Sequence, residues 1–242
     1  MRGPRLQPIA LISHPTTPCE AVRRIEAQVL RSAQATLELR YVLEGDIARL
    51  LIPAECSPRP ADKLWQHTCF EAFVAAPPDE GYYELNFSPS TQWAIYRFSA
   101  YRAGISAVDA ARAPHVSVRR EADRVSLQAV IDLDPLFSLR DGPALRLALS
   151  AVVEDEEHRL GYWALAHPPG KPDFHHAAGF ALALPALTPS PSGPASAPSP
   201  SGAASTPSPS GAASTPSPSG PASPPSPSGP ASPPSPSGRG PG

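Results

Sequence analysis

The stretch Leu64–Phe73 reads LWQHTCFEAF and is followed by Tyr82–Pro89 (YYELNFSP) and Trp93–Phe98 (WAIYRF). These three strand-like segments concentrate aromatic, acidic and amide side chains. Such a mixture suits a small-molecule cleft better than a uniform hydrophobic core. No catalytic triad and no cofactor fingerprint accompanies the segments. The sequence therefore favours a non-catalytic binding module over an enzyme.

The alternation of side chains across a strand divides these segments into two faces. One face is apolar and is predicted to lie between two sheets: Phe70, Ala72, Val74, Tyr83, Leu85 and Phe87. The opposite face carries Glu71, Glu84 and Asn86 and is predicted to be the outer face of one sheet. Residues 92–98 have two partly apolar faces, so the sequence does not decide which face of this strand lies toward the core. If Arg97 joins the two glutamates, it completes the polar floor of a cleft; the alternative is a structural ion-pair network.

The rest of the chain up to residue 187 consists of short β-rich runs that Pro and Gly interrupt, which predicts an all-β, antiparallel β-sandwich. Predicted strands cover residues 6–12, 22–31, 36–43, 47–52, 68–75, 82–87, 92–98, 115–120, 125–132, 145–153, 161–166 and 180–184. Hairpin turns are predicted at residues 44–46 and 121–123, and an acidic turn at residues 155–157. A short helical turn is expected around Asp173–His176.

Two regions of different composition define the domains. Residues 1–187 are predicted to form the folded domain, and residues 188–242 a disordered tail. The tail repeats a nine-residue unit rich in Pro, Ser, Gly and Ala, has no aromatic residue and has one charged residue, Arg239. It lacks the apolar surface needed to compensate the entropy of ordering. A protein partner that docks on the tail is the weaker alternative to an inert spacer.

Composition also bears on partners and location. The net charge of −2 lacks the basic footprint of a nucleic-acid binder, and no apolar run approaches the length of a membrane span. The three cysteines form no CxxC pair, and their odd number favours reduced thiols. We therefore predict a cytoplasmic protein that binds neither nucleic acid nor membrane.

The motifs Leu-Trp-x-x-Thr-Cys-Phe-Glu-x-Phe from residue 64, Tyr-Tyr-Glu-x-Asn-Phe-Ser-Pro from residue 82 and Gly-Lys-Pro-Asp-Phe-His-His from residue 170 resemble the bacterial DOMON-like proteins. The resemblance covers almost all of residues 6–185. This family is similar to the family 9 carbohydrate-binding modules, and the resemblance implies a β-sandwich with a ligand cleft on one sheet, used for sugars in some members and for haem in others. By motif match it implies these site residues: Trp65, Glu71, Glu84, Asn86, Trp93 and Arg97.

A saccharide-like molecule is the favoured ligand, because sugars present apolar C–H faces to aromatic rings and hydroxyls to carboxylates and amides. Trp65, Trp93 and Trp163 are the candidate indole rings. In the Pro- and Gly-rich loop at residues 168–172, Lys171 and His175 reach an anionic group on the ligand if the loop closes over the sheet. The alternative is structural: Asp173 caps a helical turn.

Other ligand classes stay open as alternatives. No cofactor is predicted, but haem ligation by His or Cys and a zinc site remain alternatives. A metal-dependent hydrolase is the catalytic alternative, and it would use His67, Asp173, His175 and His176. Neither HExxH nor GxSxG is present to support catalysis.

Overall fold

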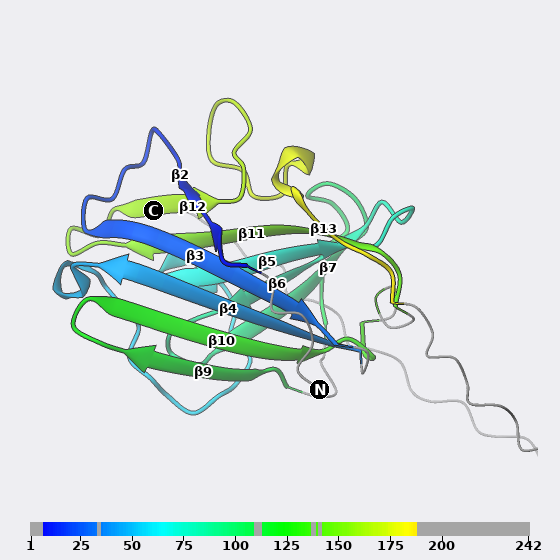
Figure 1. The fold of residues 1–242 in the computed structure, drawn as a ribbon, viewed down its shortest axis with the longest axis horizontal. Helices are drawn as coiled ribbons and strands as arrows, with labels where there is room; N and C mark the ends of the chain where they lie inside the picture. Colours follow the sequence, from blue (N-terminus) through cyan, green and yellow to red (C-terminus); the bar gives the residue numbers. More distant parts are fainter. Residues whose placement is uncertain (1–6, 33–34, 109–112, 137–138, 140–141, 188–242) are drawn as a thin grey trace, which may run out of the picture. The chain divides into compact units, whose positions relative to one another are not determined.

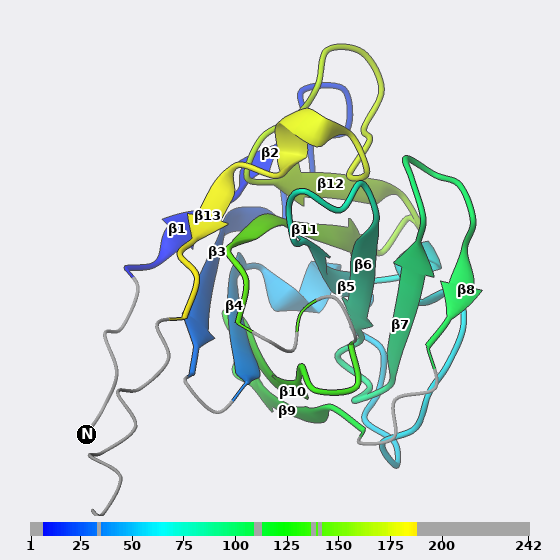
Figure 2. The ribbon, with the colours of Figure 1, turned by 90° about the vertical axis from the view of Figure 1, so that its right-hand side faces the viewer.

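The computed structural model describes residues 7–32, 35–108, 113–136, 139 and 142–187. In this part, two antiparallel β-sheets pack face to face (Figures 1 and 2), which confirms the predicted sandwich. Among the described residues, no helix combines the length and the apolar character that crossing a membrane requires. The tail predicted at residues 188–242 lies outside the described residues.

The first sheet has five strands in the order β1-β3-β4-β10-β9. Their bounds are β1 Ile9–Ala10, β3 Val22–Arg31, β4 Thr36–Gly45, β10 Arg124–Asp132 and β9 His115–Arg120. Burial alternates along β10, where every second residue is buried. Such alternation is typical of an antiparallel sheet with one face on the core and the other face toward solvent.

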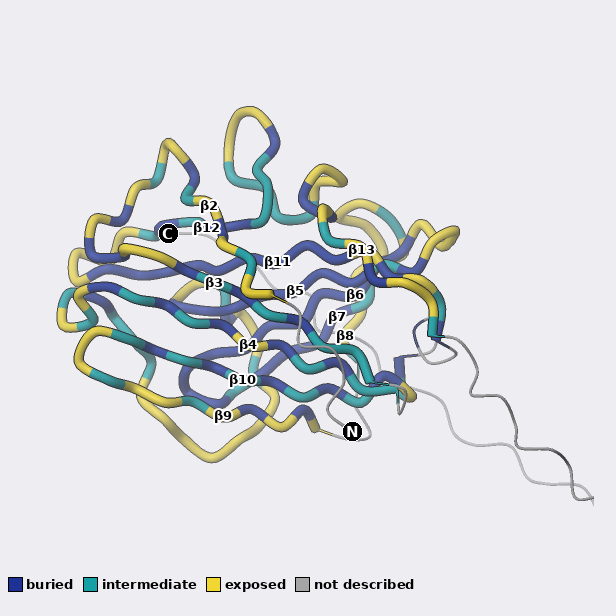
Figure 3. The backbone as a smooth tube through the Cα atoms, in the orientation of Figure 1, coloured by how far each residue is buried: buried dark blue, intermediate teal, exposed yellow. Residues whose placement is uncertain are grey.

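The second sheet has the order β2-β12-β11-β5-β6-β7-β8, and β13 also pairs with β11. Its strands are β2 Ile12–Ser13, β12 Leu160–Ala164, β11 Leu145–Glu154, β5 Cys69–Ala75, β6 Tyr82–Phe87, β7 Trp93–Phe98, β8 Ser106–Ala107 and β13 Leu182–Leu184. Every residue of β6 is buried, as are all residues of β5 except its last (Figure 3). Both faces of this sheet are therefore covered at β5 and β6.

The hydrophobic core lies between the two sheets. It contains all six residues predicted for that position: Phe70, Ala72, Val74, Tyr83, Leu85 and Phe87. They pack against buried side chains of the five-stranded sheet, including Leu39 and Leu127. The sheets are also joined by a hydrogen bond that the Tyr41 hydroxyl donates to the Glu71 carbonyl oxygen at 2.6 Å. The alternation of Phe70 and Glu71 thus sets which side of β5 faces the core.

Two local predictions near residue 45 are wrong. The predicted turn at residues 44–46 belongs largely to β4, which continues to Gly45, and Ile47–Arg49 forms a 3₁₀ helix (η1) instead of a strand. Gly45 allows this extension because a Cβ there would lie 2.1 Å from the Ala21 carbonyl oxygen. The chain can pass this close only where no side chain is present.

Other predicted connections agree more closely with the structure. The turn at residues 121–123 joins β9 to β10, and the acidic turn at residues 155–157 joins β11 to β12. The strand predicted at residues 6–12 is divided, because β1 pairs with β3 while β2 pairs with β12 in the other sheet. A turn forms at the predicted place, where the His175 backbone N–H donates to Asp173 Oδ1 at 3.1 Å. The 3₁₀ helix Ala177–Gly179 (η3) follows it and is capped by His176.

Candidate functional site

The outer face of the eight-stranded sheet carries a second cluster of buried side chains, centred on β5, β6 and β7. Strand pairing places Phe73 opposite Glu84, and Glu84 opposite Tyr96 on the next strand. In the neighbouring row, Tyr82 lies opposite Phe98 with the two rings stacked at 4.9 Å. Regular pairing therefore aligns aromatic rings and carboxyl groups on one surface.

This surface forms the floor of a pocket of about 590 Å³. Small-molecule sites commonly measure about 300–1,000 Å³. Six aromatic side chains line the pocket: Trp65, Phe73, Tyr96, Phe98, Tyr162 and Phe174. Its polar lining includes Glu71, Glu84, Arg102, Lys171 and His175. The pocket thus combines apolar walls with a few charged groups.

Glu71 and Glu84 are the most deeply placed charged groups of the pocket, with exposures of 2% and 6%. Burial raises the pKa of Glu71 well above its usual range, and the nearby Glu84 carboxyl raises it further. Burial also raises the pKa of Glu84, although hydrogen bonding to Asn86 acts in the opposite direction. Two carboxyl groups in one dry site disfavour each other's ionisation.

His175 stands beside this pair. Its ring lies edge-on to Phe73 at 4.9 Å, and its Nδ1 is 2.8 Å from the Tyr82 hydroxyl. Burial, together with the nearby Arg102 charge, lowers the pKa of His175 to about 4. The imidazole is therefore neutral at pH 7. Its Nε2 lies 3.7 Å from a Glu84 carboxyl oxygen, beyond hydrogen-bonding distance.

Two loops are joined at the rim of the pocket. Arg102, in the loop after β7, forms an ion pair of 2.7 Å with Asp173, in the loop after β12, and the Tyr101 hydroxyl also donates to Asp173. The Arg102 backbone N–H donates to the Tyr82 hydroxyl at 3.1 Å. These contacts hold the loop that carries Phe174 and His175 against the sheet. Asp173 therefore acts mainly as the link between the loops.

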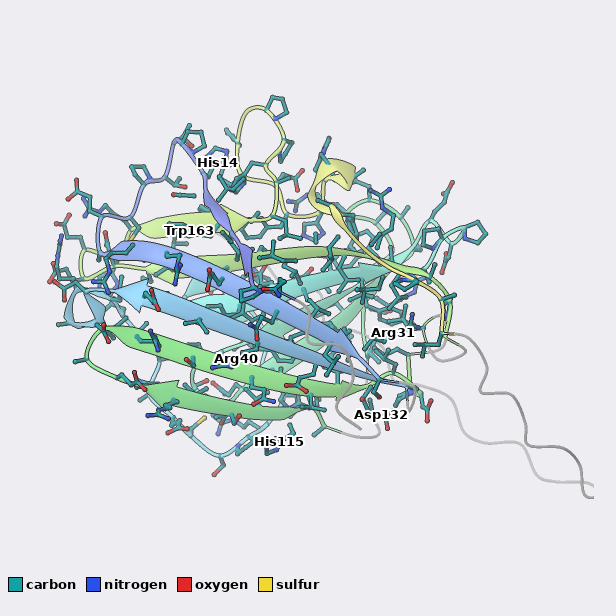
Figure 4. All side chains as sticks on the ribbon, in the orientation of Figure 1. His14, Arg31, Arg40, His115, Asp132 and Trp163 are labelled. Carbon is teal, nitrogen blue, oxygen red and sulfur yellow. The ribbon has the colours of Figure 1, made fainter. Side chains whose placement is uncertain are left out.

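The three tryptophans divide between site and core. Trp65, on the 3₁₀ helix Leu64–Gln66 (η2), lines the pocket and lies edge-on to Tyr96 at 5.8 Å. Trp93 and Trp163 belong to the core cluster that includes the residues between the sheets, and Trp163 is labelled on β12 in Figure 4. The expectation that Trp93 contributes to the cleft is corrected, since its phase on β7 directs it to the opposite side of the sheet from Tyr96.

Arg97 and Asn86 also differ from the expected arrangement. Arg97 shares the phase of Trp93 and, near the end of β7, forms an ion pair of 2.7 Å with Asp79 instead of joining the glutamates. Asn86 is fully buried beneath the pocket surface, and its Nδ2 donates to Glu84 Oε1 at 2.8 Å. It therefore supports the Glu84 carboxyl and is not part of the pocket lining.

The residues of the hydrolase alternative do not form a metal site. His67 Nδ1 lies 2.7 Å from Glu154, whereas Asp173 is bound to Arg102 and His176 caps η3. Within the described part of the chain, no group of three or more His, Cys, Asp or Glu side chains is placed to hold a metal ion. Of the four residues, only His175 lines the pocket described above.

Sequence reasoning missed several pocket residues. Phe73 and Tyr96 are the clearest cases: they lie on the same face of the sheet as Glu71 and Glu84, and this alternation was the signal that could have identified them. The long Lys-Pro-Asp-Phe-His-His motif was a signal for Phe174, which lies between two residues already singled out. Arg102 ends the stretch Tyr-x-Phe-x-x-Tyr-Arg from residue 96, which was a signal for it, but its position depends on a loop contact with Asp173.

Comparisons with known proteins show the fold. No protein-family profile matches the chain, and no curated protein matches it. A solved structure named as a "putative carbohydrate-binding protein" from Bacteroides uniformis aligns at a TM-score of 0.53 with 16% identity, covering 72% of this chain and 82% of that chain.

Two further structures are of a family 9 carbohydrate-binding module from Caldicellulosiruptor kristjanssonii, in complex with glucose and with cellotriose. Both have a TM-score of 0.36. Their identities are 13% and 12%; each alignment covers 61% of this chain, and 69% and 67% of theirs.

Proposed function

We propose that this protein is a non-catalytic binding module for a saccharide-like molecule, which it holds on the outer face of the eight-stranded sheet. One observation carries the proposal: six aromatic side chains surround two buried carboxyl groups in a pocket of about 590 Å³. The carbohydrate-binding name of the Bacteroides uniformis neighbour points the same way.

The chemistry of the pocket suits a sugar ring. The C–H faces of a pyranose pack on aromatic rings, and its hydroxyls donate to carboxylates and accept from basic groups. Trp65 and Phe174 supply rings on the walls, whereas Glu71 and Glu84 supply acceptors on the floor. Lys171, at the exposed rim, reaches an anionic or hydroxyl group on the outer part of the ligand.

We also infer a DOMON-like identity and a cytoplasmic location. The motifs around Glu71, Glu84 and Asp173 support the first inference, since the structure places all three residues in or beside the pocket. The second is supported by three free cysteines, of which Cys19 and Cys69 are buried. Buried unpaired thiols are compatible with a reducing compartment.

A matched pair of tryptophan variants tests the proposal. Neutral, amino and acidic sugars are first screened for those that raise the melting temperature, because a ligand of the native state stabilises it. Trp65→Ala should then weaken the binding of the active sugar about tenfold, or ~1.4 kcal/mol. Trp93→Phe should lower the melting temperature and leave the affinity within twofold.

Three results would contradict the proposal. The first is that no saccharide in the screen stabilises the wild type. The second is that Trp65→Ala binds the active sugar as tightly as wild type does in calorimetry. Release of a cleaved product from that sugar would overturn the non-catalytic part alone.

A further inference from the structure

The two carboxyl groups on the pocket floor are close enough to share one partner. Glu71 pairs with Asn86 across β5 and β6, and Glu84 is two residues from Asn86 on the same strand. Diagonal neighbours of this kind are about 7–8 Å apart at the backbone, within reach of long side chains. One small group held between the two carboxyls can therefore contact both.

Among the described residues, the arginines near this pair form their ion pairs with other carboxylates. Arg97 is bound to Asp79, and Arg102 is bound to Asp173, each at 2.7 Å. Among the described residues, His175 is the one basic group within 4 Å of either carboxyl, and burial lowers its pKa to about 4, so that it is neutral at pH 7. The Arg102 charge favours the ionised form of Glu84 from a distance, but no described Lys or Arg forms an ion pair with Glu71 or Glu84.

Glu71 also has an unused hydrogen-bond acceptor. Its Oε2 accepts a long hydrogen bond of 3.5 Å from Ser150, while its Oε1 has no hydrogen-bond partner among the described residues. Leaving a buried polar atom unpaired costs about 1–3 kcal/mol, and more for a charged group. A side chain that is 2% exposed and lines the pocket is thus poised to accept a donor from a ligand.

We propose that the pocket binds amino sugars, with the ligand's protonated amine placed between Glu71 and Glu84. An ammonium group supplies three donors and a positive charge, whereas a sugar hydroxyl supplies one donor and no charge. Only the ammonium relieves both the unpaired oxygen and the repulsion between the carboxyls. The apolar face of the same sugar packs on the aromatic walls. This inference rests on the saccharide-binding function proposed above.

Three glycosides that differ at one position provide the test: methyl glucoside, methyl 2-amino-2-deoxyglucoside and its N-acetyl derivative. Calorimetry at pH 6.5 with the full chain should show the free-amine glycoside binding at least tenfold more tightly than the other two. Glu71→Gln should reduce this preference below threefold. Glu55→Gln, on an exposed loop, should retain the preference.

The outcomes separate this inference from the broader function. Equal affinity for the three glycosides would overturn amine recognition and leave saccharide binding in place. No affinity for any of them would overturn amine recognition, while the wider saccharide screen decides the broader function. A preference that persists in Glu71→Gln, and also in Glu84→Gln, would place the amine elsewhere, and tight binding of Ca²⁺ to the carboxyls would identify a metal site instead.

Discussion

Replacing Glu71 with Gln should make the protein more stable at neutral pH, and the gain should depend on pH. The structure gives Glu71 no cationic partner among the described residues and leaves one of its oxygens unpaired. Its folded-state pKa is raised by burial and by Glu84, so the folded protein binds the proton more tightly than the unfolded chain does. The contribution of Glu71 to wild-type stability is therefore highest below the unfolded pKa of about 4.3 and is lost as pH rises through the folded pKa.

The magnitude follows from that linkage. Each unit by which folding raises the Glu71 pKa corresponds to about 1.4 kcal/mol of lost stability once the group is ionised in both states. Glutamine keeps the shape and the weak contact with Ser150 but removes the charge. Its amide brings a cost of about 1–3 kcal/mol if the N–H groups find no acceptor. That cost does not vary with pH. Any change with pH in the difference in free energy of unfolding between the variant and wild type therefore comes from ionisation of the Glu71 carboxyl.

Urea unfolding followed by tryptophan fluorescence, at intervals from pH 3.5 to pH 8, measures this difference. The free energy of unfolding of Glu71→Gln relative to wild type should rise with pH across the range, because burial and Glu84 raise the pKa of Glu71 in the folded wild type. Glu55→Gln, on an exposed loop, should show little such rise. A flat difference for Glu71→Gln, or one that falls with pH, would refute the reasoning, since it would mean that Glu71 is ionised at no cost or is neutralised by a cation.

Three further predictions concern packing, the rim and the tail. Gly45→Ala should lower the free energy of unfolding by about 1–3 kcal/mol, because its Cβ would clash with the Ala21 carbonyl oxygen; an unchanged urea midpoint would contradict this. Asp173→Asn breaks a partly exposed ion pair with Arg102 and should cost about 1 kcal/mol or less, whereas a loss above ~3 kcal/mol in the same assay would assign the loop a role in the core. A chain that ends at Leu187 should keep the melting temperature of the full chain, because residues 188–242 contain no aromatic side chain that can pack; a large decrease would show that the tail packs on the domain.

The parts of the site that sequence could predict are those where polarity alternates sharply. Phe70 and Glu71 differ so strongly that only one phase of β5 is compatible with a core, and the same holds for Glu84 and Leu85 on β6. Polarity alternates less clearly along β7, because Trp93 lies on one face and the aromatic residues Tyr96 and Phe98 lie on the other. Hydrophobicity alone cannot assign a strand whose two faces are both apolar.

The partners of charged residues were less predictable than the strands, because they depend on loops. Arg97 was expected to join Glu71 and Glu84, but its place near the end of β7 brings it to Asp79 in the loop before β6. Arg102 meets Asp173 only because two loops converge over the sheet. Sequence spacing and residue type do not predict which loops meet, because loops lack the regular periodicity of strands and helices.

The ambiguity of β7 and the presence of a pocket have the same physical origin. An antiparallel sheet at the surface of a sandwich normally buries one face and exposes the other, yet all six residues of β6 are buried. The inner face is covered by the second sheet, and the outer face is partly covered by the loops that carry Arg102 and Phe174. A sheet buried on both faces carries apolar residues on its outer side as well, and this removes the alternation from which a strand's phase is predicted. Glu71 and Glu84 interrupt that apolar surface and lower the stability of the fold. The stability gained in Glu71→Gln therefore also measures how much stability the surface gives up in order to bind a ligand.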